Sequence, residues 1–300
     1  MYHSFDEILE KVKGRKSLTI SVAVAQDKDV LEAIKLAMDA GLANAILVGD
    51  KREITEMLEE IGFSSDIPVI DEPDINKAAL KAVSLVKRGE AQILMKGLIN
   101  SSDFLKAVLD PGDGLRTGRL ISHLAAFEVP GQDRLIFHTD GGMNIAPDLQ
   151  QKKDILTNAI LALNAMGIEK PNVAVLTANE KVNPKMPATV DAQALVEMWE
   201  AGEFPPSVVE GPIALDVAVS SEAAKHKGII SKITGQVDLF LMPNIETGNA
   251  CGKTLIYYAG AKMAGLVLGA ANPIVMTSRA ETAIGKLNSI ALACLAYGKE

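Results

Sequence analysis

The chain has 300 residues, of which 48% are hydrophobic and 23% are charged, and its formal net charge is −8 at pH 7. This length predicts more than one hydrophobic core, so we expect two domains. The acidic balance argues against a nucleic-acid partner, because such binding depends on neutralising phosphates with Lys and Arg.

The numbers of cysteines and histidines exclude several kinds of site. The two cysteines, Cys251 and Cys294, are too few for a disulfide framework or a four-cysteine zinc site, and the four histidines lack the spacing of metal ligands. The N-terminus lacks the features of a signal peptide, and the longest low-charge stretch, 264–276, is too short to span a membrane. We therefore expect a soluble, cytoplasmic protein with no membrane partner.

The first hundred residues alternate between apolar runs and amphipathic segments. Strands are predicted at "SLTISVAVA", "NAILVG", "IPVI" and "AQILM", with helices at 27–41, 51–62 and 74–88 between them. Continuous apolar strands separated by helices indicate a parallel sheet with both faces covered. In such sheets, ligands bind beyond the carboxyl ends of the strands.

The alternation is interrupted near residues 120–140. "LISHLAAFEV" and "RLIFHTD" are joined by the turn "PGQD", which is too short for a crossover helix, so an antiparallel hairpin is predicted. The alternation then resumes, with helices expected at 148–166, 187–201, 214–226, 250–266 and 280–297 and strands between them. The hairpin is interpreted as the entry to a second domain. The expected domains are 1–125 with 270–300, and 126–269.

Polar residues gather in the loops that follow the predicted strands, which is where a site is expected. Structural explanations exist for several: Asp140 could brace the end of the hairpin, and His123 could be a buried, hydrogen-bonded histidine. Cys251 and Cys294 lie in apolar contexts and are interpreted as packing residues. The candidate loops are "KG" at 96–97, "GLRTG" at 114–118, "SH" at 122–123, "TDGGMN" at 139–144, "ANEKVNPK" at 178–185, "ETGN" at 246–249 and "TSRA" at 277–280.

The "TSRAET" segment lies between a predicted strand and the last predicted helix. Arg279 offers a planar fork of donors that suits a phosphate or a developing oxyanion. The first N–H groups of the helix also favour anions. The alternative is that Ser278 only caps the helix and Arg279 is solvated.

The stretch "NIETGNACGKTLIYY" resembles a phosphate-binding P-loop. A P-loop needs four residues between its first glycine and its Gly-Lys pair, whereas three separate Gly248 from Gly252. A nucleoside triphosphatase is therefore not the preferred interpretation.

Five longer segments resemble the phosphate acyltransferases that exchange an acyl group between coenzyme A and phosphate, and they are most similar to the phosphate butyryltransferase branch. They are "GLRTGRLISHLAAFEVPGQDRLIFHTDGGMNIAPDLQQKKDIL", "VAVLTANEKVNPKMPATVDA", "EGPIALDVAVSSEAAKHKGI", "VDLFLMPNIETGN" and "NPIVMTSRAETAIGKLNSIALA".

The resemblance implies two doubly wound, three-layer α/β/α domains with an interdomain cleft, like the isocitrate and isopropylmalate dehydrogenases, in a homodimer. It implies that acyl-CoA and phosphate, both substrates, give acyl phosphate and CoA by direct attack in a ternary complex, without a metal, a cofactor or a covalent enzyme intermediate. The alternatives are a phosphate acetyltransferase and a non-catalytic protein of the same fold that binds CoA or acyl phosphate.

The resemblance also implies site residues. Ser278 and Arg279 match the serine–arginine pair beside the reacting thiol and acyl phosphate, and substrate contacts are expected at Thr117, Ser122, His123, Asp140, Asn144, Glu246, Gly248, Asn249, Lys253 and Tyr257.

Two departures from the acetyl branch matter. Gly285 stands where that branch has an aspartate proposed as the base for the thiol, and Tyr257 stands where it has an arginine. The aromatic residue favours a larger acyl group, butyryl or branched. Glu281, Glu246, His123 and Asp140 are the remaining candidates for the proton acceptor.

Overall fold

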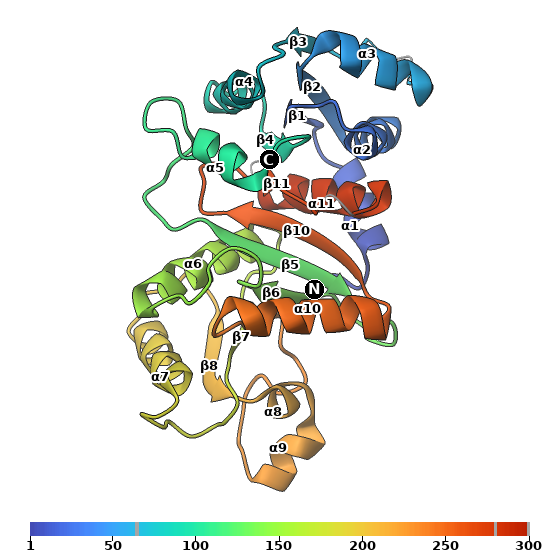
Figure 1. Ribbon diagram of the computed structural model, residues 1–300. Helices are drawn as coiled ribbons and strands as arrows, with labels where there is room; N and C mark the ends of the chain where they lie inside the picture. Colours follow the sequence, from blue (N-terminus) through green and yellow to red (C-terminus); the bar gives the residue numbers. More distant parts are fainter. Residues whose placement is uncertain (64–65, 279–280, 299–300) are drawn as a thin grey trace. The chain divides into compact units, whose positions relative to one another are not determined.

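The computed structural model describes residues 1–63, 66–278 and 281–298. The chain divides into two compact units, drawn in Figure 1. Unit 1 comprises Met1–Ser4 and Leu120–Met263, and unit 2 comprises Phe5–Arg119 and Ala264–Glu300. The sequence placed the boundaries at 125/126 and 269/270, each six residues from those of the structure.

The sheet of unit 2 has the strand order β3-β2-β1-β4-β11-β10. All pairs are parallel except that between β10 and β11, which is antiparallel. The strands are β1 (Leu18–Ala23), β2 (Ala43–Gly49), β3 (Val69–Asp71), β4 (Ile93–Lys96), β10 (Lys262–Leu268) and β11 (Ile274–Val275).

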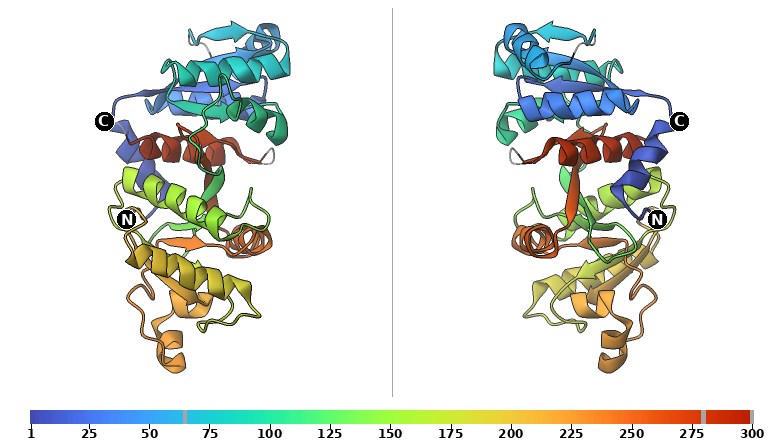
Figure 2. Two further views of the ribbon diagram at one scale, coloured as in Figure 1. Left: turned by 90° about the vertical axis from the view of Figure 1, so that its left-hand side faces the viewer. Right: turned by 90° about the vertical axis from the view of Figure 1, so that its right-hand side faces the viewer.

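Helices cover both faces of this sheet, as expected for continuous apolar strands. Helix α4 packs on β1 and contacts α5, whereas α2 contacts α11, which in turn contacts α1. Figure 2 shows α4 in front of the strands in one view and α2 in front in the other. The helices of unit 2 are α1 (Phe5–Lys13), α2 (Lys28–Asp39), α3 (Lys51–Glu60), α4 (Ile75–Lys87), α5 (Ser101–Val108) and α11 (Ala283–Ala296).

Unit 1 contains the predicted hairpin. Its strand order is β5-β6-β9-β7-β8, in which β5 and β6 are antiparallel and the other pairs are parallel. The strands are β5 (Ser122–Glu128), β6 (Ile136–Thr139), β7 (Asn172–Leu176), β8 (Val208–Ile213) and β9 (Leu239–Leu241). The helices are α6 (Leu149–Ala165), α7 (Pro187–Glu200), α8 (Leu215–Val219), α9 (Ser221–Lys227) and α10 (Ile245–Ala259).

Local signals set most helix starts. The Asp27 and Asp148 side chains accept hydrogen bonds from backbone N–H groups of α2 and α6, and Asp148 forms a full capping box with Gln151. Helix α5, which the sequence analysis did not predict, starts in the same way at Asn100. Each cap supplies an acceptor to a helix-start N–H group that would otherwise have no intrahelical partner.

Two predicted helices were wrong. The helix expected at 214–226 is two short helices, because Ser220 has an extended backbone and its side chain caps α9 by accepting from Ala223 N–H. The helix expected at 250–266 is displaced: α10 begins after the Asn244 cap and ends at Gly260, whose φ is +68°. Residues Lys262–Leu268 form β10, although the helix was expected to continue to residue 266. Gly260 is the stop signal that the sequence analysis overlooked.

Candidate functional site

The loop of unit 1 that follows β6 is organised by Asp140. Its Oδ2 accepts from His123 N–H at 3.0 Å and from the Asn144 side chain at 2.6 Å. Its Oδ1 accepts from Gly142 N–H at 2.8 Å and from Met143 N–H at 2.9 Å. Asp140 is only 2% exposed, so these four donors satisfy a buried carboxylate. The geometry matches the bracing role that the sequence left open for Asp140.

The first turn of α10 packs directly on this loop through two glycines. A Cβ on Gly248 would lie 2.6 Å from Gly141 Cα and 2.8 Å from the Asp140 carbonyl oxygen, so only glycine permits this backbone approach. The Asn249 side-chain amide faces the Gly141 carbonyl at 3.5 Å. Asp140, Asn144, Gly248 and Asn249, which are distant in the sequence, therefore form one cluster.

Four predicted site residues share one face of α10. Glu246, Asn249, Lys253 and Tyr257 are three or four residues apart and all are exposed, with Tyr257 79% exposed. "ETGN" was expected to be a loop, but it lies in the first turn of the helix. A P-loop is therefore excluded, because Gly252 and Lys253 lie inside α10 and no glycine-rich loop precedes them to surround a phosphate.

The two predicted residues at the start of β5 differ in accessibility. Ser122 is fully buried, and its hydroxyl accepts from the Asn158 side chain at 3.1 Å. His123 is half-buried, and its ring borders Gly142, where a Cβ would lie 3.2 Å from the imidazole. Burial lowers the pKa of His123, and the Asp140 charge opposes that shift. The ring is thus held neutral beside the loop that Asp140 organises.

Unit 2 carries the other predicted residues. Thr117 is exposed, and its hydroxyl donates to the Gly269 carbonyl, which ties the loop before β5 to the end of β10. Ser278 is exposed after β11, and its carbonyl accepts from Glu281 N–H at 3.1 Å. Arg279 lies outside the described residues.

Two buried lysines support loops near the carboxyl end of the unit 2 sheet. Lys96, at the end of β4, donates to the carbonyls of Gly97 (3.1 Å) and Ile99 (2.9 Å). Lys286, which the sequence analysis missed, is 2% exposed and donates to the Glu281 carbonyl. A single cation within the apolar run "AIGKLNSIALA" was the available signal, because lysine is rarely buried unless it is paired.

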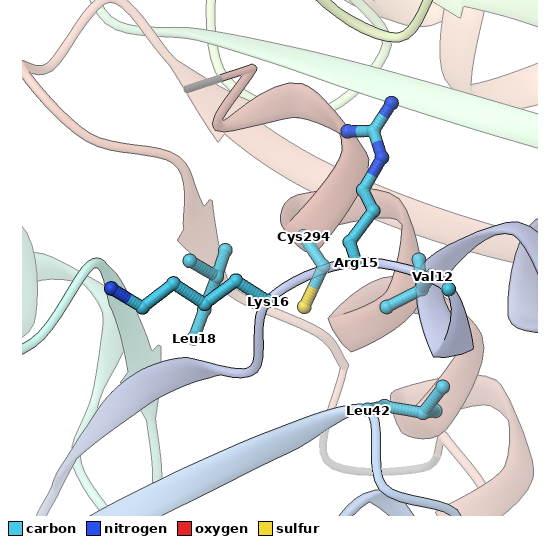
Figure 3. Close-up of a pocket in the computed structure, with 7 residues that line it drawn as sticks. Val12, Arg15, Lys16, Leu18, Leu42 and Cys294 are labelled. Carbon is cyan, nitrogen blue, oxygen red and sulfur yellow. The ribbon is translucent and has the colours of Figure 1, made fainter. Parts of the chain in front are cut away.

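A separate cavity of about 250 Å3 lies in unit 2 (Figure 3). It adjoins the starts of β1 and β2, at the edge of the sheet opposite the carboxyl ends of those strands. Burial raises the pKa of the Cys294 thiol, which lines the cavity, to about 12, and also raises the pKa of Cys251. Thiols that resist ionisation are poor nucleophiles. The lining residues are Val12, Gly14, Arg15, Lys16, Leu18, Leu42 and Cys294, none of which is a predicted site residue.

Within residues 1–63, 66–278 and 281–298, no group of three or more His, Cys, Asp or Glu side chains is arranged to hold a metal ion. In the same part of the chain, no helix combines the length and apolar character needed to cross a bilayer.

The comparisons with known proteins agree on one family. The family described as "Phosphate acetyl/butaryl transferase" matches residues 4–76 and 68–294. This chain belongs to that family. It is 48% identical over 301 aligned residues to a phosphate butyryltransferase of Clostridium acetobutylicum, covering 100% of both chains. The resemblance seen in the sequence is thereby confirmed.

Solved structures of two kinds of enzyme share this fold. A branched-chain phosphotransacylase from Enterococcus faecalis V583 superposes with a TM-score of 0.81 at 30% identity, covering 93% of this chain and 99% of the other. A 4-hydroxythreonine-4-phosphate dehydrogenase from Klebsiella pneumoniae gives a TM-score of 0.56 at 14% identity, covering 94% and 100%. The predicted α/β class, with its likeness to dehydrogenase folds, is confirmed.

His138 gives unit 1 an acid-sensitive core. Its ring packs 4.8 Å from the Phe127 ring and 5.5 Å from the Phe240 ring, and burial lowers its pKa from 6.5 to about 4. Between these values the unfolded chain binds more protons, so stability falls as the pH falls. Relative to His138→Phe, we expect the wild-type chain to lose about 3 kcal/mol of unfolding free energy between pH 7 and pH 4.

Urea denaturation of both proteins across this pH range measures the difference, and contributions common to both, such as that of His123, cancel. Equal pH dependence in the two proteins would show that His138 titrates normally.

Proposed function

We propose that this protein is a phosphate acyltransferase that converts acyl-CoA and phosphate to acyl phosphate and CoA. The observation that carries the proposal is the full-length match to a phosphate butyryltransferase at 48% identity. The structure supplies compatible features: Ser278 is exposed at a strand end, and the start of α10 packs against the Asp140 loop.

We further propose direct transfer in a ternary complex. Arg279 would stabilise the charge that develops on the acyl oxygen, with Ser278 beside it. The raised pKa values of Cys251 and Cys294 support a route without a cysteinyl intermediate. Glu246, Asn249 and Lys253 on the exposed face of α10 are the proposed contacts for CoA, and Lys253 would meet one of its phosphates.

The preferred acyl group is proposed to be butyryl or branched. The names of the butyryltransferase and of the branched-chain phosphotransacylase support this choice. Tyr257 also supports it, since an aromatic side chain in place of an arginine favours an apolar acyl group. The Tyr257 side chain is 79% exposed, so it is accessible to a substrate.

We also propose that the protein is a homodimer and that it is cytoplasmic. Tyr258, near the end of α10, is 90% exposed, and we propose that it contacts a second copy of the chain in a homodimer. A cytoplasmic location would give the enzyme access to acyl-CoA.

The experiment is a measurement of free thiol after incubation with phosphate and a panel from acetyl-CoA to octanoyl-CoA. We expect phosphate-dependent thiol release, fastest with butyryl-CoA or branched short-chain acyl-CoA. The greatest rate with acetyl-CoA would instead indicate a phosphate acetyltransferase. Absence of phosphate-dependent release from every thioester would contradict the proposal, and CoA binding without release would favour the non-catalytic alternative.

A further inference from the structure

The Glu281 carboxylate occupies the space beside Gly285 at the start of α11. A Cβ on Gly285 would lie 2.0 Å from Glu281 Oε1, 2.5 Å from its Cδ and 2.9 Å from its Cγ. The region that a side chain at position 285 would enter is therefore filled by the carboxylate of Glu281. Any residue larger than glycine at position 285 must displace this carboxylate.

The turn that carries Glu281 is anchored at several points. Glu281 N–H donates to the Ser278 carbonyl at 3.1 Å, and the Glu281 carbonyl accepts from the buried ammonium of Lys286. Glu281 Oε1 accepts from Thr282 N–H at 3.2 Å, while Thr282 Oγ1 accepts from Gly285 N–H at 3.1 Å. These bonds fix the Glu281 backbone to Ser278 and Lys286 and hold its carboxylate at the start of α11.

The carboxylate is not neutralised by a cation within the described part of the chain. Lys286 directs its ammonium to the Glu281 backbone and lies 4.0 Å from Asp29 Oδ2, so its ion pair is with Asp29. Glu281 is half-buried, which leaves part of it accessible.

The structure also separates Glu281 from the other candidate acceptors. Asp140 is only 2% exposed and its carboxylate oxygens already accept from four donors. Glu281, in contrast, donates its backbone N–H to the carbonyl of Ser278, three positions earlier in the chain.

We propose that Glu281 is the proton acceptor for the CoA thiol, an assignment that rests on the proposed function. In the direction of thioester synthesis, the thiol proton passes to the Glu281 carboxylate and the sulfur attacks the acyl carbon. The carbon–oxygen bond to phosphate then breaks, and its electron pair stays on the phosphate oxygen. The proton leaves Glu281 for the released phosphate, so CoA and acyl phosphate give acyl-CoA and hydrogen phosphate.

The first test measures thioester formation from CoA and butyryl phosphate between pH 6 and pH 9. At pH 7 only a few per cent of a free thiol is ionised, so we expect Glu281→Gln to be slower than wild type by roughly 30-fold. The deficit should shrink to about threefold or less by pH 9, because the thiol then ionises without assistance. A rate within twofold of wild type at pH 7, or the same deficit at every pH, would overturn the assignment.

The second test uses Gly285→Ala, which introduces the methyl group that displaces the carboxylate. Alanine favours a helix more than glycine does, so the variant should fold. We expect Gly285→Ala to slow the wild-type enzyme at pH 7 by roughly tenfold or more and to have no further effect in Glu281→Gln. Independent effects of the two substitutions would contradict the proposal.

The failures of the two proposals are distinguishable. A wild-type protein that does not release thiol would overturn the proposed function and this assignment together. An active wild-type enzyme that tolerates Glu281→Gln at pH 7 would overturn the assignment alone.

Discussion

Asp140→Ala is expected to lower the unfolding free energy by about 3 kcal/mol or more, because it leaves several buried donors without an acceptor. The donors that lose their partner are the N–H groups of His123, Gly142 and Met143 and the side chain of Asn144. The unfolding free energy of Asp140→Asn should lie between those of wild type and Asp140→Ala. The asparagine keeps one acceptor oxygen, but its amide group then faces donors that the second carboxylate oxygen accepted from. Denaturation monitored by circular dichroism measures the effect.

Asp133→Ala is the matched control for this series. Its side chain, in the same hairpin, is 88% exposed, so its loss should change stability by about 0.5 kcal/mol or less. We also expect Asp140→Asn to reduce phosphate-dependent thiol release, because the Asp140 loop supports Gly248 and the first turn of α10. If both Asp140 variants unfolded at the wild-type denaturant concentration, the bracing role would be wrong.

Arg279→Ala is expected to lower kcat by roughly two orders of magnitude or more, because it removes a charged donor from the developing oxyanion. Arg279→Lys keeps the charge but loses the planar fork, so its kcat should lie between those of Arg279→Ala and wild type. Steady-state thiol release with butyryl-CoA measures both values.

Arg52→Ala provides the control for the loss of an arginine. The Arg52 side chain is 88% exposed on α3 and pairs with Glu56 at 3.0 Å, so kcat should not change. If Arg279→Ala had the kcat of wild type, the proposed catalytic role of Arg279 would be wrong.

The sequence predicted most elements because their signals are local. The apolar runs of β1, β2 and β4 and the caps at Asp27 and Asp148 depend on residues within a few positions of each other. The two wrong helices have local causes as well. Ser220 and Gly260 each interrupt an apolar pattern that otherwise suits a continuous helix. The helices were predicted from the apolar pattern, without regard to these two stop signals.

The candidate site depended more strongly on folding. The sequence indicated Asp140, Gly248 and Glu281 as polar or glycine positions near predicted strand ends, but it did not distinguish a brace from a ligand contact or an acid–base group. That distinction required the four donors around Asp140, the contact between Gly141 and Gly248, and the position of Glu281 over Gly285.

By itself, the sequence determined the α/β class, the hairpin and the family, because each rests on periodicity, spacing or motif identity along the chain. Only the tertiary structure decided that "ETGN" begins a helix, that Asp140 is saturated with donors and that a carboxylate remains beside Gly285. Each of these depends on which atoms folding brings within hydrogen-bonding or van der Waals distance. Residues far apart in the sequence, such as Gly141 and Gly248, do not reveal such contacts until the chain is folded.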